Sequence, residues 1–163
     1  MFRINKQDNV IQRLKERKFS ELGFRERDHL QEWLAHYPEA LGEDLLIIQK
    51  EFNGFDGTNE RLDLLALDKS GNLVVIENKL DDSGKDVTWQ ALKYVSYCST
   101  LTKIQIIDIY QKYLDRYEDG GDARGRIVDF LEEEDFDSIV INKGTSQRII
   151  FVANNYRQEV TST

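Results

Sequence analysis

The clearest pattern of apolar and polar positions lies in two neighbouring runs near the middle of the chain. Both runs are rich in Leu, Val and Ile, and the five residues between them, 68–72, are typical of a hairpin loop. A second turn-rich segment, 53–59, predicts a loop before the hairpin. The predicted strands are 45–52, 61–67, 73–79 and a last buried strand at 148–153.

Apolar residues spaced three and four positions apart predict helices on both sides of these strands. Leu30, Trp33 and Leu34 form a core-facing stripe in a helix that begins near Glu26 and is closed by Pro38. The other predicted helices are 8–22, 86–99, 102–117 and 123–133.

The order of the elements predicts one domain over residues 1–163. Helices, three strands, further helices and a strand are typical of an α/β fold with a mixed central sheet flanked by helices. The last residues, 159–163, look like the start of another element, which suggests that the C-terminal part is truncated.

Composition indicates a globular protein, with 40% hydrophobic and 32% charged residues. The sequence has no apolar stretch near the roughly 20 residues that span a bilayer and no signal-peptide pattern, so we expect a cytoplasmic protein without a membrane partner. The single cysteine, Cys98, excludes an internal disulfide and a cysteine-rich zinc site. The net charge of −8 argues against a nucleic-acid partner, although a basic face can coexist with an acidic back.

The hairpin is predicted to place two carboxylates next to each other. If Leu67 pairs with Leu73 across the loop, Asp63 lies opposite Glu77 on the same face of the sheet. Opposed residues have Cβ atoms about 4.5–5.5 Å apart, and like charges there destabilise a sheet unless something compensates. Lys79 lies two residues further along that face.

A divalent cation compensates such a pair well, because Mg²⁺ takes one or two carboxylates together with water and substrate phosphate. A lysine beside it can act on the attacking water and offset charge on the phosphoryl oxygens. Asp63, Glu77 and Lys79 therefore indicate metal-assisted hydrolysis of a phosphodiester. The competing interpretation is a surface ion pair with a spare acid, and a one-residue register shift would separate the carboxylates.

Asp63, thirteen intervening residues and then Glu77-Asn78-Lys79 resemble the D…(D/E)XK signature of the PD-(D/E)XK nuclease superfamily. The surrounding segments resemble the NucS-type endonuclease domain over roughly residues 24–98. These segments are HYPE at 36–39, LLII at 45–48, RLDLLALD at 61–68, GNLVVIE at 71–77 and QALKY at 90–94. The resemblance implies a restriction-endonuclease-like fold and an endonuclease that acts on DNA with Mg²⁺ or Mn²⁺.

The resemblance also implies roles for single residues. Asp63 and Glu77 would bind the metal, and Lys79 would act on the nucleophilic water or the transition state. Gln90 would lie on the helix beside the site. A helical glutamate usually completes the group, and Glu26 fits that place best.

Glu32 is the second choice for that glutamate. Tyr94 would lie one turn after Gln90, where a core aromatic is a simpler interpretation than direct chemistry. Without the resemblance, Gln90 is as easily an ordinary polar residue of a helix.

The chain departs from NucS-type proteins in two respects. Their separate N-terminal domain, which binds nucleic acid and dimerises, is absent, and residues 102–163 do not match. Substrate and strand preference are therefore not transferred. A small nuclease often acts as a homodimer that cuts both strands, but the sequence shows no interface, so the oligomeric state stays open.

Other candidate sites are weaker. His29 and His36 are seven residues apart, too far to bind one metal ion without help. The basic residues within 13–18 either touch phosphates or form a solvated helix face. Two alternatives to a nuclease therefore stay open: an inactive nuclease-fold module that binds nucleic acid or a protein, and a structural domain in which Asp63→Ala is neutral or stabilising.

Overall fold

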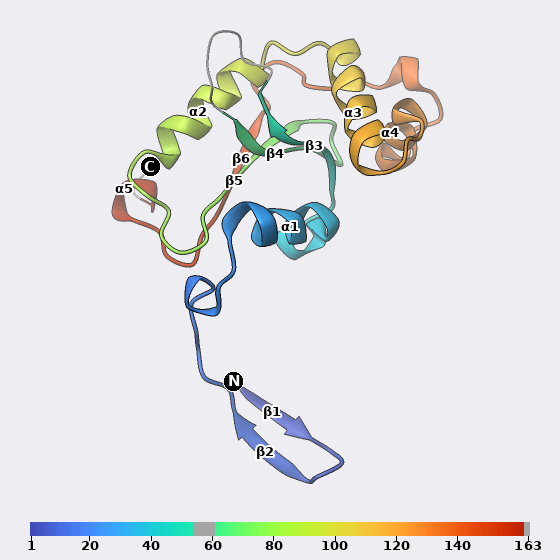
Figure 1. Ribbon diagram of the computed structural model, residues 1–163. Coiled ribbons are helices and arrows are strands. Elements are labelled where there is room, and N and C mark those ends of the chain that lie inside the picture. The colour runs from blue at the N-terminus through green and yellow to red at the C-terminus, as the bar shows by residue number, and fades with distance from the viewer. Residues whose placement is uncertain (54–60, 162–163) are drawn as a thin grey trace.

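The structure is a computed structural model that describes residues 1–53 and 61–161. A four-stranded mixed sheet lies at its centre with helices around it, as predicted (Figure 1). The strands follow chain order across the sheet, antiparallel from β3 to β5, with β6 parallel to β5. These confirm the predicted strands: β3 Leu45–Phe52, β4 Leu62–Asp68, β5 Leu73–Asn78 and β6 Arg148–Val152. Most of the predicted loop at 53–59 lies outside the described residues.

Strands β4 and β5 are buried along their whole length. Because successive side chains point to opposite faces, both faces of the sheet must be covered. Helix α2, Val87–Cys98, packs against β5 and β6, and α3, Lys103–Tyr117, packs against β3. The helical segment that begins at Glu26 contacts β4 and β5. The core therefore surrounds the central hairpin and fixes its register.

The three helices predicted between the third and fourth strands of the sheet are confirmed, with ends shifted by at most two residues. The helix expected from Glu26 starts as a π-helix, η2, and continues as a short α-helix that buries Leu34. No helix in the described part of the chain has the length and apolar character needed to cross a membrane. The remaining helices are η2 Glu26–Gln31, α1 Glu32–His36, η3 Pro38–Leu41, α4 Ala123–Leu131, η4 Phe136–Ser138 and α5 Gln158–Thr161.

The helix predicted over 8–22 is wrong. This part of the chain instead contains β1 Phe2–Asn5, β2 Val10–Arg13 and the 3₁₀ turn η1 Ser20–Leu22. Asn5 shapes the turn between the strands, because its Oδ1 atom accepts hydrogen bonds from the backbone N–H groups of Gln7 and Asp8. Asn9 completes the turn with a left-handed φ of 50°. Such local turn chemistry competes with helix formation.

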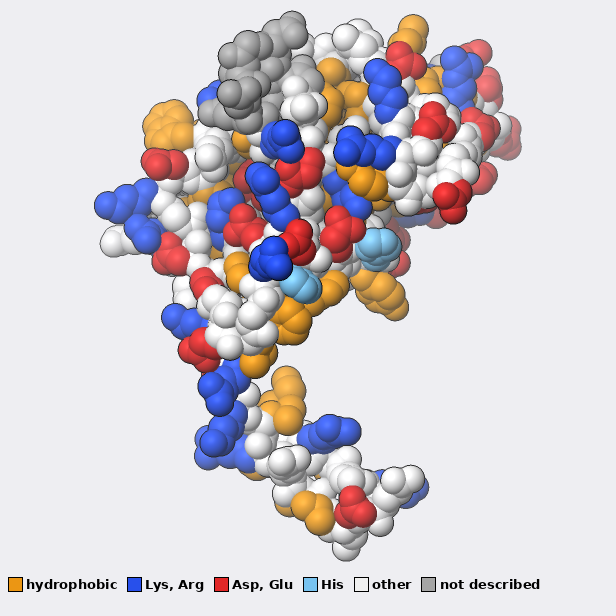
Figure 2. All heavy atoms as spheres, viewed as in Figure 1, with side chains coloured by type: hydrophobic (Ala, Val, Ile, Leu, Met, Phe, Trp, Pro, Cys, Tyr) orange, Lys and Arg blue, Asp and Glu red, His pale blue; other side chains and the backbone are white. Residues whose placement is uncertain are grey.

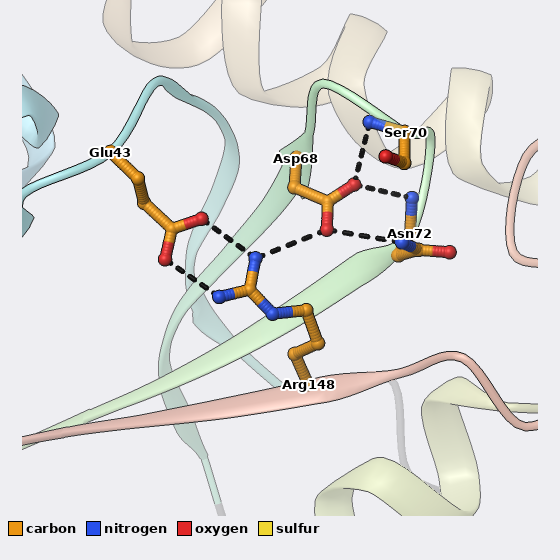
Figure 3. Close-up of polar contacts among 5 residues, drawn as sticks. All are labelled: Glu43, Asp68, Ser70, Asn72 and Arg148. Carbon is orange, nitrogen blue, oxygen red and sulfur yellow. Dashed lines mark hydrogen bonds and ion pairs between the residues drawn. The ribbon is translucent and has the colours of Figure 1, made fainter.

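Strand β6 is half-buried rather than fully buried, because it lies at the edge of the sheet. Its first residue, Arg148, donates to both carboxylate oxygens of Glu43 at 2.7 Å and to Asp68 at 3.1 Å (Figure 3). Asp68 also accepts the backbone N–H groups of Ser70 and Asn72. The Asp68 carboxylate therefore connects the β4–β5 loop to the edge strand β6.

Candidate active site

The candidate site lies at the open end of the β4–β5 hairpin. The predicted register is confirmed, because Leu67 pairs with Leu73 and the ladder continues in step toward that end. The last pair of the ladder at this end is Leu64 with Ile76, and the next opposed positions are Asp63 and Glu77. Their exposed fractions are only 6% and 3%. The fold therefore buries the two carboxyl groups whose juxtaposition the sequence predicts.

Both carboxyl groups have raised pKa values. Burial raises the pKa of Asp63 to about 6, against the opposing effect of the hydrogen bond that the Asn78 N–H donates to Asp63 Oδ2 at 2.8 Å. Burial and the nearby charge of Asp63 raise the pKa of Glu77 to about 8. Within the described residues, Glu77 Oε1 is buried without a hydrogen-bond partner. Such an oxygen is costly to bury, and a bound cation would satisfy it.

Lys79 is the first residue after β5, and its side chain contacts η2, the helical segment that begins at Glu26. Its Nζ atom lies 3.3 Å from Glu26 Oε1, and the Leu80 N–H donates to Glu26 Oε2 at 3.0 Å. The positive charge of Lys79 lowers the pKa values of Asp63 and Glu77 against the larger effect of burial. The charge of Lys79 is thus coupled to both carboxyl groups of the pair.

The structure brings Glu26 to the site and pairs Glu32 elsewhere. Glu26 is the first residue of η2, which contacts both strands of the hairpin. Glu32 accepts hydrogen bonds from the buried Lys50 at 2.8 and 3.0 Å. Lys50 in turn lies 4.2 Å from the centre of the Tyr117 ring. Glu32 therefore serves packing between β3 and the helices.

Gln90 and Tyr94 lie one turn apart on α2. Tyr94 is buried, and its hydroxyl donates to the carbonyl oxygen of Arg61 at 3.1 Å, which holds α2 to the start of β4. This is the packing role expected of a core aromatic. The side chain of Gln90 is half-buried, and in the described part of the chain no hydrogen bond joins it to Asp63 or Glu77.

A third carboxylate, Glu51, lies at the same end of the sheet and was not predicted from the sequence. In the β3–β4 ladder, Lys50 pairs with Leu64 and Phe52 pairs with Leu62. Glu51 therefore lies opposite Asp63. Glu51 has a left-handed φ of 51° and forms ion pairs with Arg27 at 3.3 Å and Arg61 at 3.8 Å. The register shift within β3 that aligns these residues carries no clear sequence signal. The only sequence feature that points to Glu51 is that it is an acidic residue near the end of a predicted strand.

The buried pair suits a hard divalent cation, because Mg²⁺ and Mn²⁺ prefer carboxylate oxygens. In residues 1–53 and 61–161, no group of three or more His, Cys, Asp or Glu side chains is arranged to hold a metal ion. A cation at the pair would therefore complete its shell with water and substrate oxygens. His29 and His36 bind locally instead: His29 Nδ1 accepts the Arg25 N–H at 3.0 Å, and His36 Nδ1 lies 2.7 Å from the Glu32 carbonyl oxygen.

The residues that the structure brings together form one charge-coupled group: Asp63, Glu77, Lys79 and Glu26. Two carboxylates with a lysine beside them are a set of groups that can hold a divalent cation and contact a phosphate oxygen. Protein-family models, curated proteins and solved structures were each compared with the chain, and none matches it.

Proposed function

We propose that the chain is a metal-dependent nuclease of restriction-endonuclease-like fold that hydrolyses DNA phosphodiester bonds. One observation carries the proposal: two carboxyl groups, Asp63 and Glu77, are buried against each other with an unsatisfied oxygen on Glu77. A fold gains no stability from this arrangement in the absence of a ligand. A divalent cation, Mg²⁺ or Mn²⁺, would satisfy both carboxylates and turn this cost into a binding site.

Each residue of the group has a place in this reaction. Asp63 and Glu77 would hold the cation, which when bound polarises a phosphoryl oxygen and makes a water molecule more acidic. Lys79 would exchange its contact with Glu26 for a phosphate oxygen and offset the charge that develops in the transition state. Glu26 orients Lys79 before substrate arrives. Gln90, on the first turns of α2, would donate a hydrogen bond to the phosphate or the attacking water.

The order of elements supports the same proposal. A helical segment, three antiparallel strands, the helices α2 to α4 and a strand parallel to β5 follow one another from η2 to β6. This order agrees with the fold implied by the D…EXK resemblance. Glu26 comes from η2, Asp63 from β4 and Glu77 from β5, and packing of η2 on the β4–β5 hairpin brings the three together.

Calorimetric titration of Mn²⁺ into the wild type and the Glu77→Gln variant tests the proposed site. We expect one ion per chain in the wild type and loss of this binding in the variant. Glu134→Gln is the matched control, because it makes the same change at an exposed position of the acidic run after α4. A titration with DNA present covers the case in which substrate phosphate completes the metal shell.

Cleavage assays on single-stranded, duplex and branched DNA then test the activity itself. We expect hydrolysis that requires Mg²⁺ or Mn²⁺ and is lost in Glu77→Gln. Absence of metal binding both with and without DNA would rule out the nuclease.

The second candidate is a nuclease-fold module without catalysis that binds nucleic acid or a protein. Two observations favour it: Lys79 is already paired with Glu26, and the described residues offer no ready three-ligand metal group. The net charge of −8 favours a protein over a nucleic acid as its ligand. Metal binding without any cleavage of the three DNA forms would support this candidate.

A further inference from the structure

The N-terminal hairpin presents an apolar surface to solvent. In the β1–β2 ladder, Phe2 pairs with Arg13 and Ile4 pairs with Ile11, so these four side chains share one face of the ribbon. We call these four residues the hairpin face. Phe2, Ile4 and Ile11 are 60%, 75% and 66% exposed. A cluster of large apolar groups this exposed marks an interaction surface.

The body of the protein holds this hairpin away from its own core. Figure 1 shows β1 and β2 standing apart from the sheet and helices, and every residue of the two strands is exposed. The segment that follows the hairpin is held to the body, because Phe19 packs edge-on against Phe24 and Trp33 at centroid distances of 5.8 and 5.6 Å. A two-stranded ribbon is only marginally stable by itself in water. A partner that covers the hairpin face would therefore stabilise it.

The chemistry of the hairpin face favours a protein partner over nucleic acid. Apolar side chains gain free energy by leaving water against other apolar groups. A phosphate backbone offers them no such surface, and its affinity for a protein depends on cations. Three of the four side chains in the hairpin face are uncharged and apolar.

The distribution of charge favours a second copy of this chain as that partner. Residues 1–22 hold six Lys and Arg against three Asp and Glu, which leaves 16 and 27 for residues 23–163. Figure 2 shows Lys and Arg side chains gathered along the segment that joins the hairpin to the body. A basic arm thus projects from an acidic body, and arm and body of two copies attract each other.

The body carries an apolar surface that can receive the hairpin face. Trp33 in α1 and Tyr37, the residue that follows α1, lie one helical turn apart and are 41% and 70% exposed. The exposed Glu39 follows them and suits the basic arm. In Figure 2, hydrophobic side chains gather on the side of the body that is turned toward the hairpin.

We propose that residues 1–22, the basic arm, bind a second copy of this chain. Each arm lays its hairpin face on the Trp33–Tyr37 surface of the other copy, so that one contact is made twice in a closed, two-fold symmetric dimer. The proposal does not depend on the proposed nuclease activity.

Sedimentation velocity of the full chain over a wide concentration range tests the proposal. Wild type should form a dimer, and Ile11→Glu should weaken it by at least about tenfold in Kd. Val10→Glu is the matched control, because Val10 is the adjacent β-branched residue, also exposed, and points to the opposite face of the ribbon. It should leave the dimer intact. Tyr37→Ser should weaken the dimer as Ile11→Glu does, and added salt should weaken it as well.

A zero-length cross-linker that joins amines to carboxylates locates the contact. In a mixture of ¹⁴N- and ¹⁵N-labelled wild type, we expect mixed-isotope links between Lys6 or Lys15 and acidic residues of the body. A wild type that stays monomeric at all concentrations overturns the proposal. So does equal weakening by Ile11→Glu and Val10→Glu, and a Tyr37→Ser variant with unchanged Kd overturns the assigned receiving surface.

Discussion

Asp63 and Glu77 are opposed across two buried strands, and Glu77, with a pKa of about 8, keeps its proton at neutral pH while Asp63, with a pKa of about 6, is mostly ionised. The pair therefore carries one negative charge rather than two. Burial is the main cause for both residues. A cation that binds both carboxylates must displace the proton on Glu77, which couples metal binding to pH.

Binding of Mn²⁺ near neutral pH should release about one proton per chain. The observed heat should then differ between two buffers with different ionisation enthalpies, and isothermal titration calorimetry measures this directly. Affinity should increase as the pH rises toward the pKa of Glu77, about 8, because less work is needed to remove the proton. Binding whose heat and affinity are independent of buffer and pH would place the cation elsewhere.

The metal-free protein should lose stability as the pH rises. Glu77 has a folded-state pKa of about 8, above its ordinary value of 4.5, so the folded state binds the proton more tightly than the unfolded state. Its contribution is fully present below the ordinary pKa and is lost as the pH rises through about 8. Glu77→Gln removes this dependence and should stabilise the protein above that pH by about 2 kcal/mol or more.

Urea unfolding of the metal-free protein at several pH values measures the effect. Glu134→Gln, at an exposed position, should follow the wild type throughout. A Glu77→Gln variant that tracks the wild type across the whole range would contradict a buried, protonated Glu77.

The central hairpin could be predicted because its loop fixes its register. Once Leu67 lies opposite Leu73, the two-residue period of a strand leaves Asp63 opposite Glu77. The prediction failed at 8–22, where partial apolar spacing suggested a helix. Hydrogen bonds from the backbone of the turn to the side chain of Asn5 decide the structure there, and such local chemistry does not appear in hydrophobic periodicity.

The remaining site residues depend on packing that a linear pattern does not contain. Glu26 and Glu32 sit in the same helical segment, and the sequence does not decide between them. In the structure Glu32 pairs with the buried Lys50, while Glu26 pairs with Lys79, so only Glu26 lies beside the candidate site. Glu51 comes opposite Asp63 only because β3 shifts register.

Lys79→Met should reduce the rate of DNA hydrolysis by about 10²–10³ while Mn²⁺ binding is kept. The reason is that, in the proposed mechanism, Lys79 would stabilise charge on the phosphoryl oxygens rather than hold the cation. Single-turnover cleavage and calorimetry on the same variant separate the two effects. Lys112→Met, at an exposed position of α3, is the control and should cleave like the wild type. Loss of metal binding in Lys79→Met would instead give the lysine a structural role.

Arg148→Met should destabilise the fold by about 1–3 kcal/mol, because it leaves the buried Asp68 without its charged donor. Burial raises the pKa of Asp68, but the hydrogen bonds from Asn72, Arg148 and Ser70 together lower it below its ordinary value. The stability that this network provides is therefore present at neutral pH and lost as the pH falls through the folded-state pKa.

The control for Arg148→Met is Arg157→Met. It removes an arginine whose partner, Asp82, is 47% exposed, so it should change stability much less. Thermal and urea unfolding of both variants compare them, and equal losses would mean that the contact drawn in Figure 3 adds little beyond a surface ion pair.

Glu51→Gln should lower the pKa of Asp63, because the negative charge of Glu51 is one of the causes that raise it. The variant keeps the size of the side chain and its left-handed backbone, so the change reports charge alone. Titration of the Asp63 carboxyl carbon by NMR measures the shift, with Glu39→Gln as the control at an exposed position. A lower pKa of Asp63 in Glu51→Gln but not in the control would place three carboxylates in one row across β3, β4 and β5. An unchanged pKa would mean that Arg27 and Arg61 already neutralise Glu51, and the candidate site would then consist of the Asp63–Glu77 pair with Lys79 and Glu26.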